Sequence, residues 1–231
     1  MSKYYIPTNT PEDWKSLLAE PDKHWKTGYS AKALAYCWQE ANGFPKSVKG
    51  VFKNSGIKIF QDAEMLVAFP EYRVPLPGGK RASQSDIFVL ARGNDQIIAI
   101  AVEGKVDESF GDTIAKWKLK DEGGKKERLN FLCRELQLDE ATIDHIRYQL
   151  LHRTASAIIE AKRFNAKNAL MLVHSFNQLK ENENEGFQDY CQFLKLFSKE
   201  GKMNSVILAK NIGGINLYFG WVRGEEKYLK V

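Results

Sequence analysis

The stretch IIAIAVEGKVDES, residues 97–109, decides the fold, because its first six residues form an apolar run typical of a buried β-strand. The run ends abruptly in Glu103, Gly104 and Lys105. A strand that only filled a core would not end in a carboxylate and an ammonium group. Alternate side chains of a strand share a face, so Glu103 and Lys105 are expected to project together, with Cα atoms about 6.6 Å apart, while Gly104 faces the other way.

Two further strands are predicted immediately before this one. Residues 65–76, MLVAFPEYRVPL, are extended and apolar, and a Pro-Gly-Gly turn follows them. Residues 86–90, DIFVL, form the second strand, and the turn RGND leads into the third, residues 96–106. The short links predict an antiparallel meander, in which Asp86 at the start of one strand lies beside Glu103 at the end of the next.

The rest of the chain alternates helices and strands, so the predicted fold class is mixed α/β with a central sheet flanked by helices. We expect one domain, 1–231, made of a helical N-terminal extension (1–45), a core (46–176) and a C-terminal helix with a hairpin (177–231). The expected elements are helices at 31–40 (with Ser30 as N-cap), 46–52, 126–135 and 142–164, an exposed loop at 118–128, a strand at 169–176, an acidic loop and amphipathic helix within 181–200, and hairpin strands at 205–210 and 215–222. Trp14, Trp25 and Trp38 are expected to pack between the N-terminal helices.

Composition and charge limit the function classes. The chain has 231 residues, of which 43% are hydrophobic and 27% charged, as in an ordinary globular protein. Its apolar runs are too short to cross a bilayer, and its first residues lack a signal core, so we expect a cytoplasmic protein with no membrane partner. Three dispersed cysteines argue against a disulfide framework or a structural zinc site. The net charge of +5 favours a polyanionic partner only weakly, and the oligomeric state stays open, a homodimer included.

Two carboxylates and a lysine at one sheet edge indicate metal-assisted chemistry. Asp86 and Glu103 would repel each other unless a cation neutralised them, and Mg²⁺ (or Mn²⁺) is bound by one or two carboxylates together with phosphate oxygens. Lys105 could then orient or deprotonate a water molecule as the nucleophile. Other chemistries lack their motifs: there is no GxSxG, GxGxxG, Walker loop or HExxH.

The motif Ser85-Asp86, sixteen residues (87–102), then Glu103-Gly104-Lys105 resembles the D…ExK signature of the PD-(D/E)xK, or restriction-endonuclease-like, nuclease superfamily. The resemblance implies that Asp86 and Glu103 hold the metal, that the Gly104 carbonyl joins them, and that Lys105 serves the attacking water. It also implies an αβββαβ core, the order predicted for residues 46–176. Ser85 stands where many members have proline. VEGKVDESFG and RYQLLHRTASAIIEAKRF are also similar to a bacterial domain family of unknown function usually grouped with this superfamily.

The resemblance implies further site residues. Glu64 is the best match to a glutamate that some members contribute from the first helix, and Gln149 matches a glutamine on the crossover helix that faces the metal. His152 and Arg153 follow Gln149 on one helical face that could reach a phosphate or the metal-bound water. We expect Arg153, with Lys80 or Arg81, to contact phosphate. Structural roles are the alternative for four of the helical residues: hydrogen bonding for His152, and helix pairing or snorkelling for Arg153, Glu160 and Arg163. His174 is expected to be structural, and Asp107 and Glu108 to be exposed loop carboxylates or hydrogen-bond partners of the metal ligands rather than ligands themselves.

The sequence therefore predicts a metal-dependent phosphodiesterase acting on DNA. The alternative is a non-catalytic module that binds nucleic acid or protein on the same fold. A third reading is a metal-dependent enzyme acting on a small phosphorylated substrate.

Overall fold

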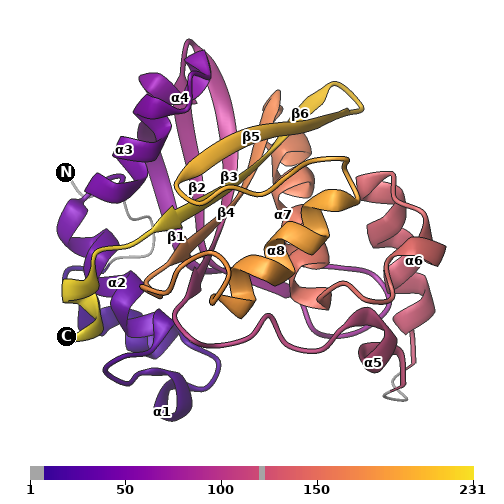
Figure 1. Ribbon diagram of the computed structural model, residues 1–231, viewed down its shortest axis with the longest axis horizontal. Coiled ribbons are helices and arrows are strands. Elements are labelled where there is room, and N and C mark those ends of the chain that lie inside the picture. Colours follow the sequence, from indigo (N-terminus) through magenta and orange to yellow (C-terminus); the bar gives the residue numbers. More distant parts are fainter. Residues whose placement is uncertain (1–7, 120–122) are drawn as a thin grey trace.

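A six-stranded mixed sheet in the order β1-β2-β3-β4-β6-β5 forms the centre of the protein (Figure 1). The computed structural model describes residues 8–119 and 123–231. The strands are β1 (Glu64–Val74), β2 (Ser83–Gly93), β3 (Gln96–Lys105), β4 (Asn168–Ser175), β5 (Ser205–Ile212) and β6 (Ile215–Arg223). The helices are η1 (Pro11–Leu17), α1 (Pro21–His24), α2 (Ser30–Ala41), α3 (Lys46–Asn54), α4 (Lys58–Gln61), α5 (Ile114–Leu119), α6 (Lys125–Leu136), η2 (Glu140–Thr142), α7 (Tyr148–Arg163), α8 (Glu185–Lys195) and η3 (Glu226–Leu229).

The strand directions confirm the predicted mixed α/β class. Strands β1, β2 and β3 pair antiparallel, which confirms the meander. Helix α7 precedes β4, which lies parallel to β3, and β6 lies parallel to β4. The C-terminal strands β5 and β6 form the predicted antiparallel hairpin.

The two faces of the sheet bury separate apolar cores. Ala99 and Ala101 of β3 face the core shared with α6, α7 and α8. Ile98 and Ile100 face the opposite core, shared with α2, α3 and α4. Figure 1 shows these two helical layers on either side of the sheet. Because side chains alternate along a strand, Glu103 projects toward the α7 side, as Ala99 and Ala101 do.

The predicted helix at 142–164 begins later, at Tyr148. Residues before it are held by backbone hydrogen bonds to the segment after β3: Ile114 donates to Ile146, and Tyr148 donates to Asp112. Because these tertiary hydrogen bonds take the place of helical ones, the helix begins only at Tyr148. The predicted loop at 118–128 is also partly wrong, because α5 covers its first residues and α6 begins at Lys125, while 120–122 lie outside the described residues.

The N-terminal extension, described from Thr8 onward, packs on the sheet as a helical layer. Trp14 and Trp38 are buried in the core on this side and Trp25 packs against it, as predicted. Ser30 is not the N-cap of α2 but its first residue, and its backbone N–H donates to Glu108 Oε1 at 2.8 Å. A carboxylate from the loop after β3 therefore supplies the acceptor that Ser30 was expected to supply.

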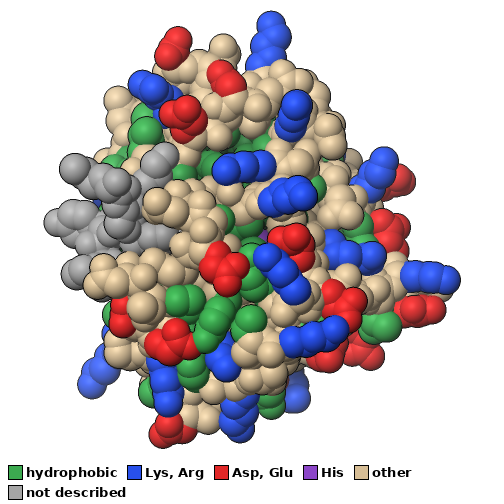
Figure 2. Space-filling view, turned by 90° about the vertical axis from the view of Figure 1, so that its left-hand side faces the viewer, with side chains coloured by type: hydrophobic (Ala, Val, Ile, Leu, Met, Phe, Trp, Pro, Cys, Tyr) green, Lys and Arg blue, Asp and Glu red, His purple; other side chains and the backbone are tan. Residues whose placement is uncertain are grey.

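The surface bears charges of both signs. Over the face seen in Figure 2, Lys and Arg side chains are interspersed with Asp and Glu side chains. The net charge of +5 is therefore not gathered into one basic patch on that face. Among the described residues, none of the helices has the length and apolar character needed to cross a bilayer.

Candidate functional site

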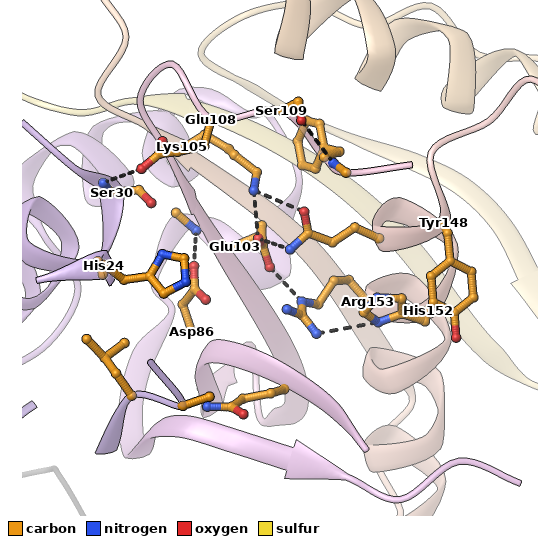
Figure 3. Close-up of a pocket in the computed structure, with 18 of the residues that line it drawn as sticks. His24, Ser30, Asp86, Glu103, Lys105, Glu108, Ser109, Tyr148, His152 and Arg153 are labelled. Atoms are coloured by element: carbon orange, nitrogen blue, oxygen red, sulfur yellow. Dashed lines mark hydrogen bonds and ion pairs between the residues drawn. The ribbon is translucent and has the colours of Figure 1, made fainter. Parts of the chain in front are cut away.

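A cavity of about 720 Å³ opens where strands β2 and β3 end their pairing. The last residue pair of the β2–β3 ladder is Ile87 with Val102. The next residues, Asp86 and Glu103, therefore lie just beyond the end of the ladder. The cavity is lined by residues from these strands, from α7, from the loop after β3 and from the segment around α1. Figure 3 shows that Asp86, Glu103, Lys105 and Arg153 point toward one another in it.

Glu103 is the centre of a buried network (Figure 3). Lys105 Nζ donates to its Oε1 at 3.0 Å, and Gln149 Nε2 donates to the same oxygen at 2.5 Å. Arg153 Nε donates to Oε2 at 2.6 Å. Burial alone would raise the pKa of Glu103, but the charges of Arg153 and Lys105 outweigh it and hold the pKa below its ordinary value. Glu103 is therefore a stable anion.

Asp86 has the opposite electrostatic character. Its Oδ2 accepts the backbone N–H of Gly104 at 2.6 Å. Burial, and next the charge of Glu103, raise the pKa of Asp86 to about 7, although Arg153 and Lys105 act against this. Their surroundings therefore raise the pKa of Asp86 and lower the pKa of the neighbouring Glu103.

Gly104 allows this close approach. A Cβ at this position would lie 3.2 Å from Asp86 Oδ2 and 3.2 Å from Leu34 Cδ2. Because the N–H and C=O of one residue face the same side of an extended strand, the Gly104 carbonyl is directed to the β2 side, where Asp86 lies.

Glu71 is a site residue that the sequence reading missed. It follows Pro70, which pairs with Ile87, and precedes Tyr72, which pairs with Ser85, so Glu71 lies on β1 opposite Asp86. Its backbone is left-handed, with φ 52°, and its Oε2 accepts from Gln84 Nε2 at 2.6 Å.

Burial, and then the charge of Asp86, raise the pKa of Glu71 well above its ordinary value. The only sequence signal for this residue was a lone carboxylate in the apolar stretch 65–76.

Gln149, His152 and Arg153 lie on one face of α7, as predicted, and all three have protein partners. Arg153 Nη1 donates to Ser83 Oγ at 3.1 Å, in addition to the bond from its Nε to Glu103. His152 Nδ1 lies 2.8 Å from Ser83 Oγ. Burial, followed by the charge of Arg153, lowers the pKa of His152 well below its ordinary value, so the ring is neutral.

Three predicted residues lie elsewhere. Glu64 is exposed and pairs with Arg92, six residues from Asp86 along β2, or roughly 20 Å. The long β1–β2 hairpin therefore places Glu64 at the end of the sheet remote from the cavity. Lys80 and Arg81 line a second cavity that adjoins the first, without reaching the carboxylates.

His174 has the structural role that was expected. It accepts the Trp38 Nε1–H at Nδ1 (3.0 Å), and its Nε2 lies 3.1 Å from Ser47 Oγ. Because Nδ1 accepts, Nε2 carries the proton, so this histidine cannot deprotonate Ser47. Arg163 pairs with Glu160 at 3.3 Å, which confirms the helix pairing expected for those two residues.

Residues 7–226 match one family. The chain belongs to the family described as Domain of unknown function (DUF6946). The matched residues of the DUF6946 domain include every residue that lines the cavity. No curated protein and no solved structure matches the chain significantly.

The cavity of the DUF6946 domain offers a partial coordination sphere. Within residues 8–119 and 123–231, no three His, Cys, Asp or Glu side chains gather closely enough to hold a metal ion by themselves. Oxygens that could bind a cation include the Asp86 carboxylate, the Gly104 carbonyl, Glu103 Oε2 and the Glu71 carboxylate, which lines the same cavity. A carboxylate has about four lone-pair positions, and three donors occupy Glu103, so its Oε2 can accept once more. Two carboxylates, a carbonyl and waters are a ligand set typical of Mg²⁺.

Proposed function

We propose that the DUF6946 domain is a Mg²⁺- or Mn²⁺-dependent phosphodiester hydrolase that acts on DNA. The observation that carries the proposal is the pair of carboxylates Asp86 and Glu103, with pKa values pushed apart, beside Lys105 in one cavity. Such separated pKa values are common at catalytic sites.

Asp86, Glu103 and the Gly104 carbonyl would hold the cation. A bound Mg²⁺ supplies charge stabilisation at phosphate oxygens and lowers the pKa of a bound water. The elevated pKa of Asp86, about 7, marks a carboxylate whose anion lacks sufficient neutralisation by its protein neighbours. A cation at this position would supply it.

Lys105 would position the attacking water. Gln149 Oε1 accepts from Lys105 Nζ at 3.0 Å and its amide nitrogen donates to Glu103, so Gln149 fixes the orientation of both groups. The ring of Phe110 lies under the ammonium group, with 4.7 Å between Nζ and the ring centroid. This apolar wall limits the directions in which Nζ can donate.

A relation to the PD-(D/E)xK superfamily is part of the proposal. It is supported by the order of the elements, in which three antiparallel strands precede α7 and a strand parallel to β3, with α5, α6 and η2 inserted before α7. It is also supported by the position of Asp86 and the Glu-Gly-Lys triplet at one end of adjacent strands. The net charge of +5 also favours a polyanionic substrate.

The test is cleavage of DNA by the purified protein with millimolar Mg²⁺ or Mn²⁺. We expect nicking or degradation that EDTA stops and that the Lys105→Ala variant lacks. An exposed lysine remote from the cavity, Lys53, provides the matched control as Lys53→Ala. Cleavage by Lys105→Ala at the rate of the parent protein would reject the proposed site.

The network around Glu103 favours one alternative, a non-catalytic module on the same fold. Lys105, Gln149 and Arg153 already neutralise this carboxylate without a cation. Calorimetric titration separates the two readings: heat of Mn²⁺ binding that is lost in Asp86→Asn supports the enzyme. Absence of binding at millimolar metal, with and without DNA, supports the module.

A further inference from the structure

A second cavity, of about 730 Å³, adjoins the carboxylate cavity. The two share Trp117, Tyr148 and His152 in their walls. Trp117 and Tyr148 are stacked, with ring centroids 4.2 Å apart and planes inclined by 11°, and form a partition between the cavities. Each cavity is as large as sites that hold drug-sized ligands, so together they have room for an extended molecule.

The second cavity differs from the first in the charges of its lining residues. Its charged lining residues, among those the structure describes, are Lys80, Arg81, Lys125 and Arg128, with no carboxylate among them. The first cavity has charges of both signs: the carboxylates Glu71, Asp86, Glu103, Glu108 and Asp112, and the cations Lys23, Lys105 and Arg153. One elongated ligand would therefore meet a carboxylate cluster with its own cations at one end and cations alone at the other.

Arg128 is a buried cation bound to backbone oxygens. Its Nε donates to the Pro77 carbonyl at 2.9 Å and its Nη2 donates to the Gly79 carbonyl at 3.2 Å. These acceptors are neutral, and within the described part of the chain no carboxylate forms an ion pair with Arg128. A buried charge normally has such a partner, and an anionic ligand would provide it.

Close backbone packing fixes the position of Arg128. Gly78, with φ 70°, lies so near the start of α6 that a Cβ would come within 2.1 Å of the Gly124 carbonyl. The loop 76–79 therefore wraps the guanidinium against α6. The charge of Arg128 also acts on a residue that lines both cavities. The pKa of His152 is lowered mainly by burial, next by the charge of Arg153, and then by the charge of Arg128.

We propose that the second cavity binds a non-reacting phosphate of a nucleic-acid strand whose adjacent phosphodiester occupies the carboxylate cavity. The inference rests on the proposed function and extends it, because it makes a polymer with more than one phosphate, rather than a small phosphodiester, the preferred substrate. Lys80 and Arg81 are exposed at the cavity and contact the phosphate, while Arg128 supplies fixed positive charge. Phosphate contacts of this kind set the register of a strand without reading its bases.

The test compares a single-stranded DNA oligonucleotide with bis(p-nitrophenyl) phosphate, which has one phosphate only. In the double variant Lys80→Ala/Arg81→Ala we expect the ratio of kcat/KM for the oligonucleotide to kcat/KM for the ester to fall about tenfold or more, as for loss of one charge-assisted hydrogen bond. The control variant Lys53→Ala/Lys58→Ala removes the same charge from exposed positions on α3 and α4 and should keep the ratio. An unchanged ratio in Lys80→Ala/Arg81→Ala overturns the inference and leaves the proposed function standing.

Binding is measured separately, by fluorescence anisotropy of a labelled oligonucleotide in EDTA. The double variant should bind about tenfold more weakly, and the slope of log K against log salt should decrease by roughly 0.7 for each phosphate that the variant no longer neutralises. If the parent protein hydrolyses neither substrate, the proposed function fails, and weaker binding by the double variant still supports the phosphate site. Equal binding by the parent and the double variant overturns it.

Discussion

Lys105 Nζ donates to Glu103 Oε1 at 3.0 Å, so the acid and the amine that end β3 form a buried ion pair. The strand keeps both on one face, and α7 adds Gln149 and Arg153 around them. Asp86, one strand away, forms no ion pair with any residue that the structure describes, and its pKa is raised. The two carboxylates should therefore respond to substitution in opposite ways.

Lys105→Ala should lower the rate of phosphodiester hydrolysis by about 10²- to 10⁴-fold, the range for loss of a group that assists proton transfer. Arg153 still pairs with Glu103 in this variant, so the fold should persist. Initial rates with Mn²⁺ measure the loss, and circular dichroism checks the fold. A folded variant with the parent rate would contradict the role of Lys105.

Asp86→Asn should make the metal-free protein more stable at about pH 8. The pKa of Asp86 is about 7 in the folded protein against an ordinary value of 3.8. Between these values the folded state binds more protons than the unfolded state, so the contribution of Asp86 to stability falls as pH rises from about 4 to 7 and stays low above.

Thermal unfolding in EDTA across this pH range measures the effect. The parent protein and Asp86→Asn should differ most above about pH 7 and converge near pH 4. An Asp86→Asn variant that is less stable than the parent protein at the alkaline end would show that the ionised Asp86 carboxylate does not destabilise the folded protein.

Glu103→Gln should destabilise the protein by about 3–5 kcal/mol, because it leaves Lys105 and Arg153 buried without their counterion. Denaturant unfolding at neutral pH gives the free energy. Adding Arg153→Met should recover part of the lost stability, because it removes one of the two buried cations that have lost their counterion. If Glu103→Gln were as stable as the parent protein, the ion pairs of Glu103 with Lys105 and Arg153 would make no net contribution to stability.

Gly104→Ala should reduce activity more than stability. The new Cβ would lie 3.2 Å from Asp86 Oδ2, which must move away from the Gly104 N–H. Gly50→Ala is the matched control, because nothing lies within 4 Å of a Cβ there and alanine favours the α3 helix. Rates measured with Mn²⁺ should fall in Gly104→Ala and stay unchanged in Gly50→Ala, and equal rates in both would remove Gly104 from the site.

Local patterns predicted the elements that carry the central residues. The apolar run 97–102, the meander and the helical face of Gln149, His152 and Arg153 all depend on near neighbours in sequence, and the structure brings Asp86, Glu103, Lys105 and Gln149 together.

Features that depend on remote parts of the chain were not predictable in the same way. The position of Glu71 follows from strand register and a left-handed backbone, and the remote position of Glu64 follows from the length of the β1–β2 hairpin. The late start of α7 depends on bonds to residues 112–114, and the cap of α2 comes from Glu108, 78 residues away. In each case a tertiary contact decides between alternatives that local pattern leaves equal.

The most direct test of the central claim is a crystal structure of the protein soaked in Mn²⁺, with anomalous diffraction data. We expect one strong anomalous peak bound by Asp86, Glu103 and the Gly104 carbonyl, at about 2.1 Å from their oxygens, as for a small oxygen-bound divalent cation. No peak in this cavity at millimolar Mn²⁺, or a peak bound only by residues outside it, would contradict the account.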